Sequence, residues 1–250
     1  MNDVDAASAV RLWHESAPGA VVLDGFHAVK HALRFGADVR LVLTSDKASV
    51  LALAAELADD LTGTLGRSVV EVPADELRQL VPKVHPTRVM ALAVRRGRAD
   101  NLAELTAAPR RSPVVVLDNP RNLGNVGAVV RLAAGFGATG VVTTGDLDPW
   151  HPNAVRAGAG LHFATAVEPM ALDAFPPGPL YALDPEGGDI RSVTVPDDAL
   201  LAFGSERHGL SPELRERADA LLALPMRPQV SSYNLATSVA MTLFHWGGPN

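Results

Sequence analysis

The sequence of 250 residues contains no cysteine. Disulfides, thiolate zinc sites and a cysteine nucleophile are therefore excluded, and a reducing compartment, the cytoplasm, is the expected location. The chain also lacks long hydrophobic runs, because Gly, Pro and charged residues interrupt every stretch before it reaches the roughly 18 residues of a spanning helix. Residues 1–15 have no basic segment followed by an apolar run, so no signal peptide is predicted. We expect a soluble protein without a membrane partner.

Acidic residues outnumber basic ones, but the excess is not spread evenly along the chain. The chain is 47% hydrophobic and 20% charged, as in globular proteins, and its formal net charge is −6. Residues 1–111 hold 14 basic and 14 acidic residues, whereas 112–250 hold 8 and 14. Within the first part, residues 77–111 carry eight basic residues against two acidic ones. This segment is either a solvated surface beside a linker or a face that contacts phosphates.

Short apolar runs alternate with helical patterns in the first part, which predicts a small α/β domain. The expected strands are 20–23, 39–45, 69–72 and 88–94, and the expected helices are 26–35, 47–62 and 75–80. The polar segment 97–113 ends in Pro-Arg-Arg-Ser-Pro and interrupts this rhythm. We therefore predict one domain over 1–105, a linker over 106–112 and a second domain over 113–250.

The second part contains continuously apolar runs separated by helical stretches. Such runs are typical of a parallel sheet that helices cover on both faces. The expected strands are 113–118, 140–144, 179–184, 199–204 and 220–225. A final helix near 235–246 is apolar nearly all round, so we expect it to pack against the sheet or against another subunit.

Polar loops follow three of these strands. They cover residues 118–127, 204–210 and 225–234, and they carry Asn, Arg, Glu and Ser side chains. The carboxyl ends of parallel strands meet at one edge of a sheet, where open α/β sheets bind ligands. The three loops together therefore predict a functional site.

The glycines at 135, 137 and 140 spell a dinucleotide fingerprint. That fingerprint must follow a strand and open a helix, whereas here a helix precedes the glycines and a strand follows them. This order disfavours a nicotinamide cofactor. We expect Gly137 to end the helix as its C-cap.

Two further patterns do not indicate catalysis. His27 and His31 are spaced like zinc ligands on a helix, but Ala28 stands where the metalloprotease pattern requires glutamate. Ser205 lacks the glycine two residues later that a nucleophile elbow needs. We predict no metal site and no serine hydrolase.

Three stretches resemble motifs one, two and three of the SpoU/TrmH family of RNA 2′-O-methyltransferases, which belongs to the SPOUT superfamily. They are NPRNLGNVGAVVRLAAGFGATGVV (119–142), FGSERHGL (203–210) and LPMRPQVSSYNLATSVA (224–240), in that order and at suitable spacing. The resemblance covers essentially all of 113–246. The stretch VVLDGFHAVKHAL (21–33) resembles the start of the family's small N-terminal substrate-binding domain, which is similar to certain ribosomal proteins.

The resemblance implies a C-terminal parallel-sheet α/β domain with a deep trefoil knot that acts as a homodimer and holds S-adenosylmethionine. The positions that match functional polar residues of the family, here taken as catalytic, are Asn125, Arg131, Glu206, Ser232 and Asn234. The positions implied to lie at the cofactor are Thr143, Gly204, Leu224, Met226 and Tyr233. The basic segment supplies the candidates for RNA phosphate contacts: Arg88, Arg95, Arg96 and Arg98.

Two positions depart from the family pattern. Family members commonly have Leu where Tyr233 stands, and Ser or Thr where Ala236 stands. The lining of the cofactor pocket is therefore expected to differ slightly, while no group assigned to the chemistry is removed.

A ribose hydroxyl is a poor nucleophile until its proton is lost or its developing charge is stabilised. We expect Arg131 to grip a phosphate and stabilise the forming alkoxide, because a neutral guanidine is energetically expensive. Whether Arg131 also takes the proton is left open. Glu206 is expected to orient either Arg131 or the loop of Asn125, and no metal is required.

The expected function is methyl transfer from S-adenosylmethionine to a ribose 2′-hydroxyl of ribosomal or transfer RNA. One alternative is a catalytically inactive RNA-binding protein of the same fold, which loss of Arg131 or Glu206 would favour. The other is a nicotinamide-dependent oxidoreductase, which only the misplaced glycines support. The target RNA and its nucleotide stay open.

Overall fold

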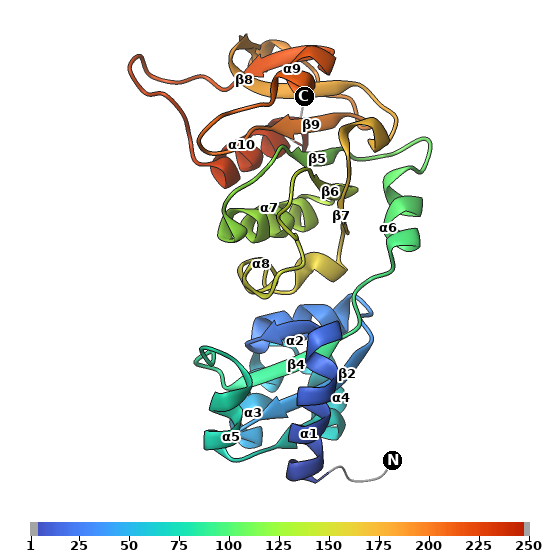
Figure 1. The fold of residues 1–250 in the computed structure, drawn as a ribbon, viewed down its shortest axis with the longest axis vertical. Helices are drawn as coiled ribbons and strands as arrows, with labels where there is room; N and C mark the ends of the chain where they lie inside the picture. The colour runs from blue at the N-terminus through green and yellow to red at the C-terminus, as the bar shows by residue number, and fades with distance from the viewer. Residues whose placement is uncertain (1–4, 248–250) are drawn as a thin grey trace. The chain divides into compact units, whose positions relative to one another are not determined.

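A computed structural model of the chain describes residues 5–247 (Figure 1). The chain forms two compact units. The first comprises residues 1–96 and 159–164, and the second comprises 97–158 and 165–250. The outermost residues of both predicted domains, 1–4 and 248–250, lie outside the described part. Among the described residues, no helix has the length and apolar character needed to cross a membrane.

The first unit is a small α/β domain built on a mixed four-stranded sheet. Strand β4 lies between β1 and β2 and runs antiparallel to both, while β3 pairs parallel with β2. The elements in chain order are α1 (Ala6–Ser16), β1 (Val21–Asp24), α2 (Phe26–Arg34), β2 (Val39–Thr44), α3 (Lys47–Leu57), α4 (Thr62–Ser68), β3 (Val69–Glu71), α5 (Ala74–Leu80) and β4 (Val89–Ala93).

Two helices of this unit differ from the expectation. Helix α1 is not among the predicted elements; the side chain of Asp5 caps it by accepting from the Ser8 amide at 2.9 Å, and the helix buries Ala9 and Trp13, one turn apart. The helix predicted over 47–62 ends at Leu57, because Ala58 takes an extended φ of −162°. A 3₁₀ turn and α4 follow it.

The second unit is built on a six-stranded sheet in which every neighbouring pair of strands is parallel, which confirms the predicted parallel α/β fold. The strand order is β10-β8-β9-β5-β6-β7. The elements in chain order are α6 (Arg98–Leu105), β5 (Val114–Leu117), α7 (Leu123–Phe136), β6 (Gly140–Thr143), α8 (Pro152–Ala157), β7 (Ala166–Pro169), β8 (Leu180–Asp189), β9 (Leu200–Phe203), α9 (Pro212–Arg217), β10 (Ala220–Ala223) and α10 (Leu235–Gly247).

The strand order explains why the polar loops after β5 and β9 lie close together. The chain adds β6 and β7 on one side of β5, then returns to place β8, β9 and β10 on its other side, with β9 next to β5 (Figure 1). Ligands of open parallel sheets bind at such a reversal, beyond the carboxyl ends of the strands. The loops after β5 and β9 flank this point.

Helix α7 ends as expected, at Gly137. This residue has φ +71° and donates its amide to the carbonyl groups of Ala133 and Ala134, which satisfies the end of the helix. Gly140 begins β6. The glycine fingerprint therefore spans a helix end and a strand start, and the structure gives the oxidoreductase alternative no support.

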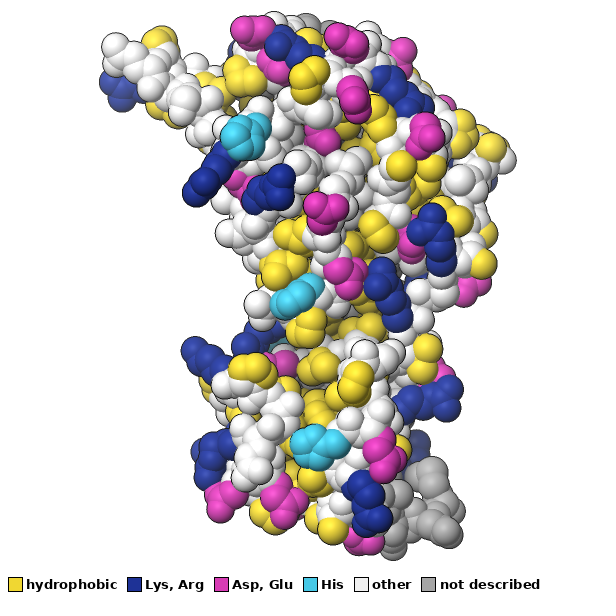
Figure 2. Space-filling model, viewed as in Figure 1, with side chains coloured by type: hydrophobic (Ala, Val, Ile, Leu, Met, Phe, Trp, Pro, Cys, Tyr) yellow, Lys and Arg dark blue, Asp and Glu magenta, His cyan; other side chains and the backbone are white. Residues whose placement is uncertain are grey.

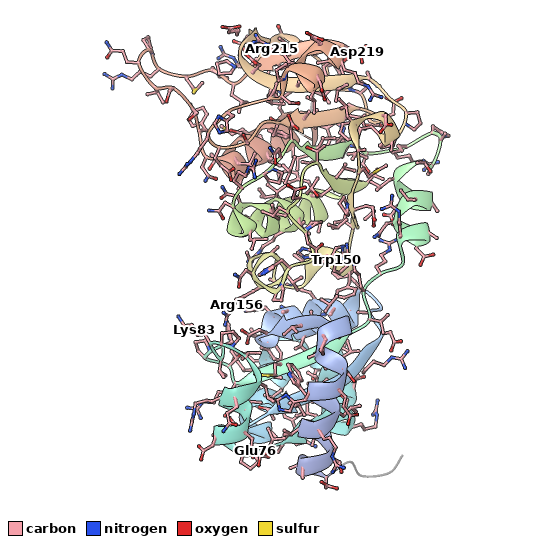
Figure 3. All side chains as sticks on the ribbon, in the orientation of Figure 1. Glu76, Lys83, Trp150, Arg156, Arg215 and Asp219 are labelled. Atoms are coloured by element: carbon pink, nitrogen blue, oxygen red, sulfur yellow. The ribbon has the colours of Figure 1, made fainter. Side chains whose placement is uncertain are left out.

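The boundary between the units falls at residue 96, before the predicted end of the first domain at 105, because α6 packs on strand β7. The buried side chain of Asn101 donates to the Val167 carbonyl and to Glu168 Oε2, both at 3.1 Å. Arg98 Nη1 lies 2.6 Å from Glu168 Oε1. Strand β7 is not among the predicted strands, since its buried Glu168 interrupts the apolar run. The Trp150 indole, labelled in Figure 3, donates a hydrogen bond to the Val167 carbonyl of this strand.

Candidate active site

A pocket of about 620 Å³ lies at the carboxyl ends of β9 and β10 and beside residues 183–185 of β8. Its floor includes apolar side chains of the strands and of helix α10, and its rim is polar. The residues that line it are Leu183, Asp184, Pro185, Phe203, Gly204, Ser205, Glu206, Arg207, Gly209, Leu222, Leu224, Met226, Ser231, Ser232, Tyr233, Asn234, Leu235 and Ser238. Two of the three predicted loops therefore form one concave site.

The loop after β9 folds back on itself at Gly204. Ser205 and Gly209 exchange two backbone hydrogen bonds, of 2.8 and 3.0 Å. A Cβ atom on Gly204 would lie 2.0 Å from the Gly209 carbonyl carbon and 2.2 Å from the Leu210 nitrogen, so only glycine fits. Glu206, Arg207 and His208 of this narrow loop are exposed, and Glu206 and Arg207 line the pocket.

Glu206 joins the loop after β9 to the loop after β5. Its Oε1 accepts from Asn125 Nδ2 at 2.7 Å, and its Oε2 accepts from the Arg121 amide at 3.2 Å. Asn125 Oδ1 in turn accepts from Asn234 Nδ2 at 3.3 Å. Of the two roles expected for Glu206, the structure shows contact with the Asn125 loop. Three of the five predicted catalytic residues thus form one hydrogen-bonded chain.

Side-chain hydrogen bonds fix the start of helix α7 and the loop before it. The Asn122 side chain caps it by accepting from the Asn125 amide at 3.1 Å. The buried carboxylate of Asp118 accepts from the Thr144 hydroxyl at 2.8 Å and from the Ser211 amide at 2.6 Å. Asp118 therefore links the ends of β5 and β6 to the start of α9, and sequence reasoning did not assign it a role.

Tyr233 closes the long loop between β10 and α10, which extends away from the body of the second unit in Figure 1. Its hydroxyl donates to the Pro225 carbonyl at 3.0 Å, across eight residues of the chain. The leucine common at this position in the family has no hydroxyl to make this bond. The departure therefore adds a tie at the base of the loop.

Four of the five residues expected at the cofactor line the pocket: Gly204, Leu224, Met226 and Tyr233. Thr143 does not line it. It is fully buried in β6, and within the described part of the chain its hydroxyl has no hydrogen-bond partner. Successive strand residues face opposite sides, so its neighbour Thr144, not Thr143, reaches the loop after β5.

Arg131 is exposed on α7, outside this pocket. It lines a separate depression with Ala128, Leu132, Gly135, Phe136 and Ala157. Over residues 5–247 its guanidinium has no recorded hydrogen bond or ion pair. Within one chain, Arg131 is therefore not brought to Glu206 and Asn125, because six helical residues turn it to another face of α7.

Sequence reasoning missed Leu183, Asp184 and Pro185, which line the same pocket. The signal was present, since the strand predicted over 179–184 ends at the same edge of the sheet. The Asp184 carboxylate accepts from the Glu186 amide at 2.9 Å and lies 3.4 Å from Arg215 Nε. The carboxylate of Asp219, which is labelled with Arg215 in Figure 3, accepts a hydrogen bond from the Leu180 amide at 2.7 Å.

The four arginines predicted to contact RNA do not share one unit. Arg88, Arg95 and Arg96 belong to the first unit, whereas Arg98 belongs to the second and pairs with Glu168. Arg88 has φ +50°, and its carbonyl accepts from the Thr44 hydroxyl at 2.7 Å. The ion pair with Glu168 fixes helix α6, so there is less reason to assign Arg98 to RNA binding.

The second unit is an open parallel α/β domain with a ligand-sized pocket at the carboxyl ends of its strands. Residues 112–244 match the model of the SpoU rRNA Methylase family. This chain belongs to that family. The match includes all three loops of the site and ends within helix α10.

Two relatives and one solved structure illustrate the similarity. A ribosomal RNA small subunit methyltransferase G 2 of Syntrophobacter fumaroxidans is 33% identical over 65% of this chain and 32% of its own. A 23S rRNA (adenosine(1067)-2′-O)-methyltransferase of Streptomyces azureus is 33% identical over 54% of each chain. The AdoMet-bound rRNA methyltransferase structure from Sinorhizobium meliloti shares the fold, with a TM-score of 0.74 and 24% identity, covering 97% of this chain and 92% of the other. The chain spans a third to a half of the length of these two curated relatives.

Proposed function

We propose that this protein is an S-adenosylmethionine-dependent RNA methyltransferase that modifies a ribose 2′-hydroxyl. The observation that carries the proposal is the pocket beside β8 and at the carboxyl ends of β9 and β10, lined by Glu206 and Asn234, which both hydrogen-bond to Asn125. Family membership and the 2′-O-methyltransferase name of the Streptomyces azureus relative support the same reaction. Ribosomal or transfer RNA is the proposed partner, and the cytoplasm the proposed location.

The residues present fit this cofactor. A volume of about 620 Å³ lies within the range of roughly 300 to 1,000 Å³ typical of small-ligand sites. Leu183, Leu222 and Leu224 offer apolar surface for an adenine ring, and Gly204 lines the same pocket. The bound cofactor would supply an activated methyl group on a sulfonium.

The chain's own residues would position the RNA ribose against that methyl group. Glu206 holds the loop of Asn125, and Asn234 holds it from the start of α10. Ser232 lines the pocket beside Tyr233 and would shape the space for the ribose. Arg131 would grip a phosphate and stabilise the developing alkoxide. The trefoil knot and the substrate-binding role of the first unit stay predictions.

The first test is ligand selectivity. We expect the purified protein to bind S-adenosylhomocysteine saturably and not to bind NAD, since the site opens at β9 and β10 and the glycine fingerprint ends a helix. Isothermal titration calorimetry with each ligand measures this. Saturable NAD binding without a response to S-adenosylhomocysteine would overturn the proposed function.

Methyl transfer separates the enzyme from an inactive RNA-binding protein of the same fold. The active protein transfers radiolabelled methyl groups to RNA, and the product resists alkaline cleavage at the modified ribose because the 2′-oxygen is blocked. Binding of RNA and cofactor without transfer would favour the inactive alternative.

We also propose that the second unit forms a homodimer through the outer face of α7 and α10. Phe244 of α10 is 69% exposed, and the depression on α7 adds Leu132 and Phe136. A Cβ atom on Gly247, at the end of α10, would lie 4.0 Å from the Phe136 ring, so the end of α10 lies close to the depression on α7. A second copy would cover this surface and would decide which loops Arg131 faces.

Light scattering at micromolar concentration tests the dimer. The wild-type chain should be dimeric and Phe244→Glu monomeric, because a carboxylate buried at the interface would be desolvated without a partner. Phe35→Glu is the matched control, since Phe35 is 50% exposed in the first unit and should leave the dimer intact. A wild-type monomer would contradict the proposal.

A further inference from the structure

The arginines of the second unit fall into two groups. This unit holds eleven arginines and no lysine, against sixteen acidic residues, so a basic side chain there has many potential partners. The arginines of the first group are engaged within the protein: Arg98 pairs with Glu168, Arg191 with Asp189 and Arg215 with Glu186, Arg110 and Arg217 donate to backbone carbonyls, and Arg156 also interacts within the chain.

The second group lies mainly on the loops of the candidate site. In the part of the chain that the structure describes, no hydrogen bond or ion pair of the guanidinium is recorded for Arg121, Arg131, Arg207 or Arg227, and all four are exposed. Arg121 follows β5, Arg207 follows β9 and Arg227 follows β10. Arg131, on helix α7, and Arg111, in the segment before β5, lie outside the pocket. Arginines without recorded partners thus concentrate on the three loops, in a unit where acids are in excess.

Hydrogen bonds connect two of these loops, so the positions of their arginines are not independent. Glu206 accepts from the Arg121 amide at 3.2 Å, and Arg207 is the next residue after Glu206. The carboxylate of Glu206 is already engaged by Asn125 Nδ2 at 2.7 Å. The two backbones are therefore held side by side while their guanidinium groups extend into solvent. Figure 2 shows basic side chains on and beneath the projecting loop of this unit.

We infer that Arg121, Arg207 and Arg227 bind backbone phosphates of the RNA strand that enters the site. This inference rests on the proposed function and deepens it. A guanidinium recognises phosphate with two parallel donors, and an arginine that has no carboxylate partner loses no ion pair when it binds one. The second unit, although acidic overall, therefore makes its own electrostatic contacts with RNA at the reaction centre.

The position of these arginines also gives them a distinct task. Phosphate contacts fix the register and orientation of a nucleic acid without reading its sequence. Contacts on loops around the pocket would hold the phosphates that flank the target ribose, whereas basic residues of the first unit would act on other parts of the RNA. Loss of the loop arginines should therefore weaken binding of many RNA sequences alike.

Salt dependence of binding tests the inference with the full-length chain. The probe is a fluorescently labelled RNA stem-loop, and the readout is anisotropy over a series of salt concentrations. Arg121→Gln, Arg207→Gln and Arg227→Gln should each reduce the slope of log Kobs against log salt by about 0.7 to 0.9, and the triple variant by roughly the sum. Arg191→Gln is the matched control, because Arg191 is exposed but paired with Asp189, and its slope should stay within error.

Calorimetry with S-adenosylhomocysteine is run on the same proteins. Arg121→Gln and Arg227→Gln should bind it as the wild type does, which shows that the site is folded. Wild-type salt slopes in the triple variant, or an equal loss in Arg191→Gln, would overturn the inference and leave the proposed function standing if wild-type methyl transfer is measured. A wild-type protein that binds no S-adenosylhomocysteine would instead overturn the proposed function.

Discussion

Arg131→Ala should slow methyl transfer to bound RNA by about 10² to 10³-fold, equivalent to roughly 3 to 4 kcal/mol, and should hardly change cofactor affinity. The reason is its setting. Arg131 is exposed on α7, it has no recorded ion pair among the residues that the structure describes, and it lies on the face that we propose a second copy covers. A cation covered by protein needs an anion, and an RNA phosphate can supply one. Single-turnover methylation measures the effect.

Arg131→Lys distinguishes geometry from charge. Lysine keeps the positive charge but has no planar pair of donors, so a variant as slow as alanine would indicate bidentate binding, and substantial recovery would indicate charge alone. Arg191→Ala serves as the control for removing an exposed arginine of this unit. A wild-type single-turnover rate in Arg131→Ala would make Arg131 a surface residue and remove it from the mechanism.

Gly204→Ala should weaken S-adenosylhomocysteine binding by about 10 to 100-fold. A Cβ at this position would lie 2.0 Å from the Gly209 carbonyl carbon, so the loop after β9 must open and the rim of the pocket must move. Overpacking of this kind costs about 1 to 3 kcal/mol, and about 1.4 kcal/mol is a tenfold change in affinity. Calorimetry on the variant measures the loss.

The matched control is Gly188→Ala. Gly188 lies in β8 of the same sheet, and a Cβ there would meet no atom within 4 Å, so cofactor binding should be unchanged. Circular dichroism checks that both variants are folded. Wild-type affinity in a folded Gly204→Ala would show that the loop does not form the rim of the cofactor site.

The three loops could be placed from the sequence because each follows a continuous apolar strand, and parallel strands put their carboxyl ends at one edge. The same reasoning did not include the residues around Asp184, although they end an equally clear apolar run. Thr143 was assigned to the cofactor through resemblance, and in the structure it is buried in β6 and does not line the pocket. Strand β7 was missed because Glu168 reads as a surface residue until Arg98 and Asn101 are seen to pair with it.

Features that depend on neighbouring residues were therefore determined by the sequence alone. They are the apolar strands, the Asn122 cap, the Gly137 helix end and the three polar loops. Hydrogen bonds and packing between residues 81 to 109 positions apart, such as those joining Glu206, Asn125 and Asn234, were decided only by the tertiary structure. The same holds for the arginines, because whether a guanidinium has a partner depends on which acids the fold brings within reach. The spacing of residues along the sequence shows helical and strand periodicity. It does not give the distance between segments that come together only when the sheet assembles.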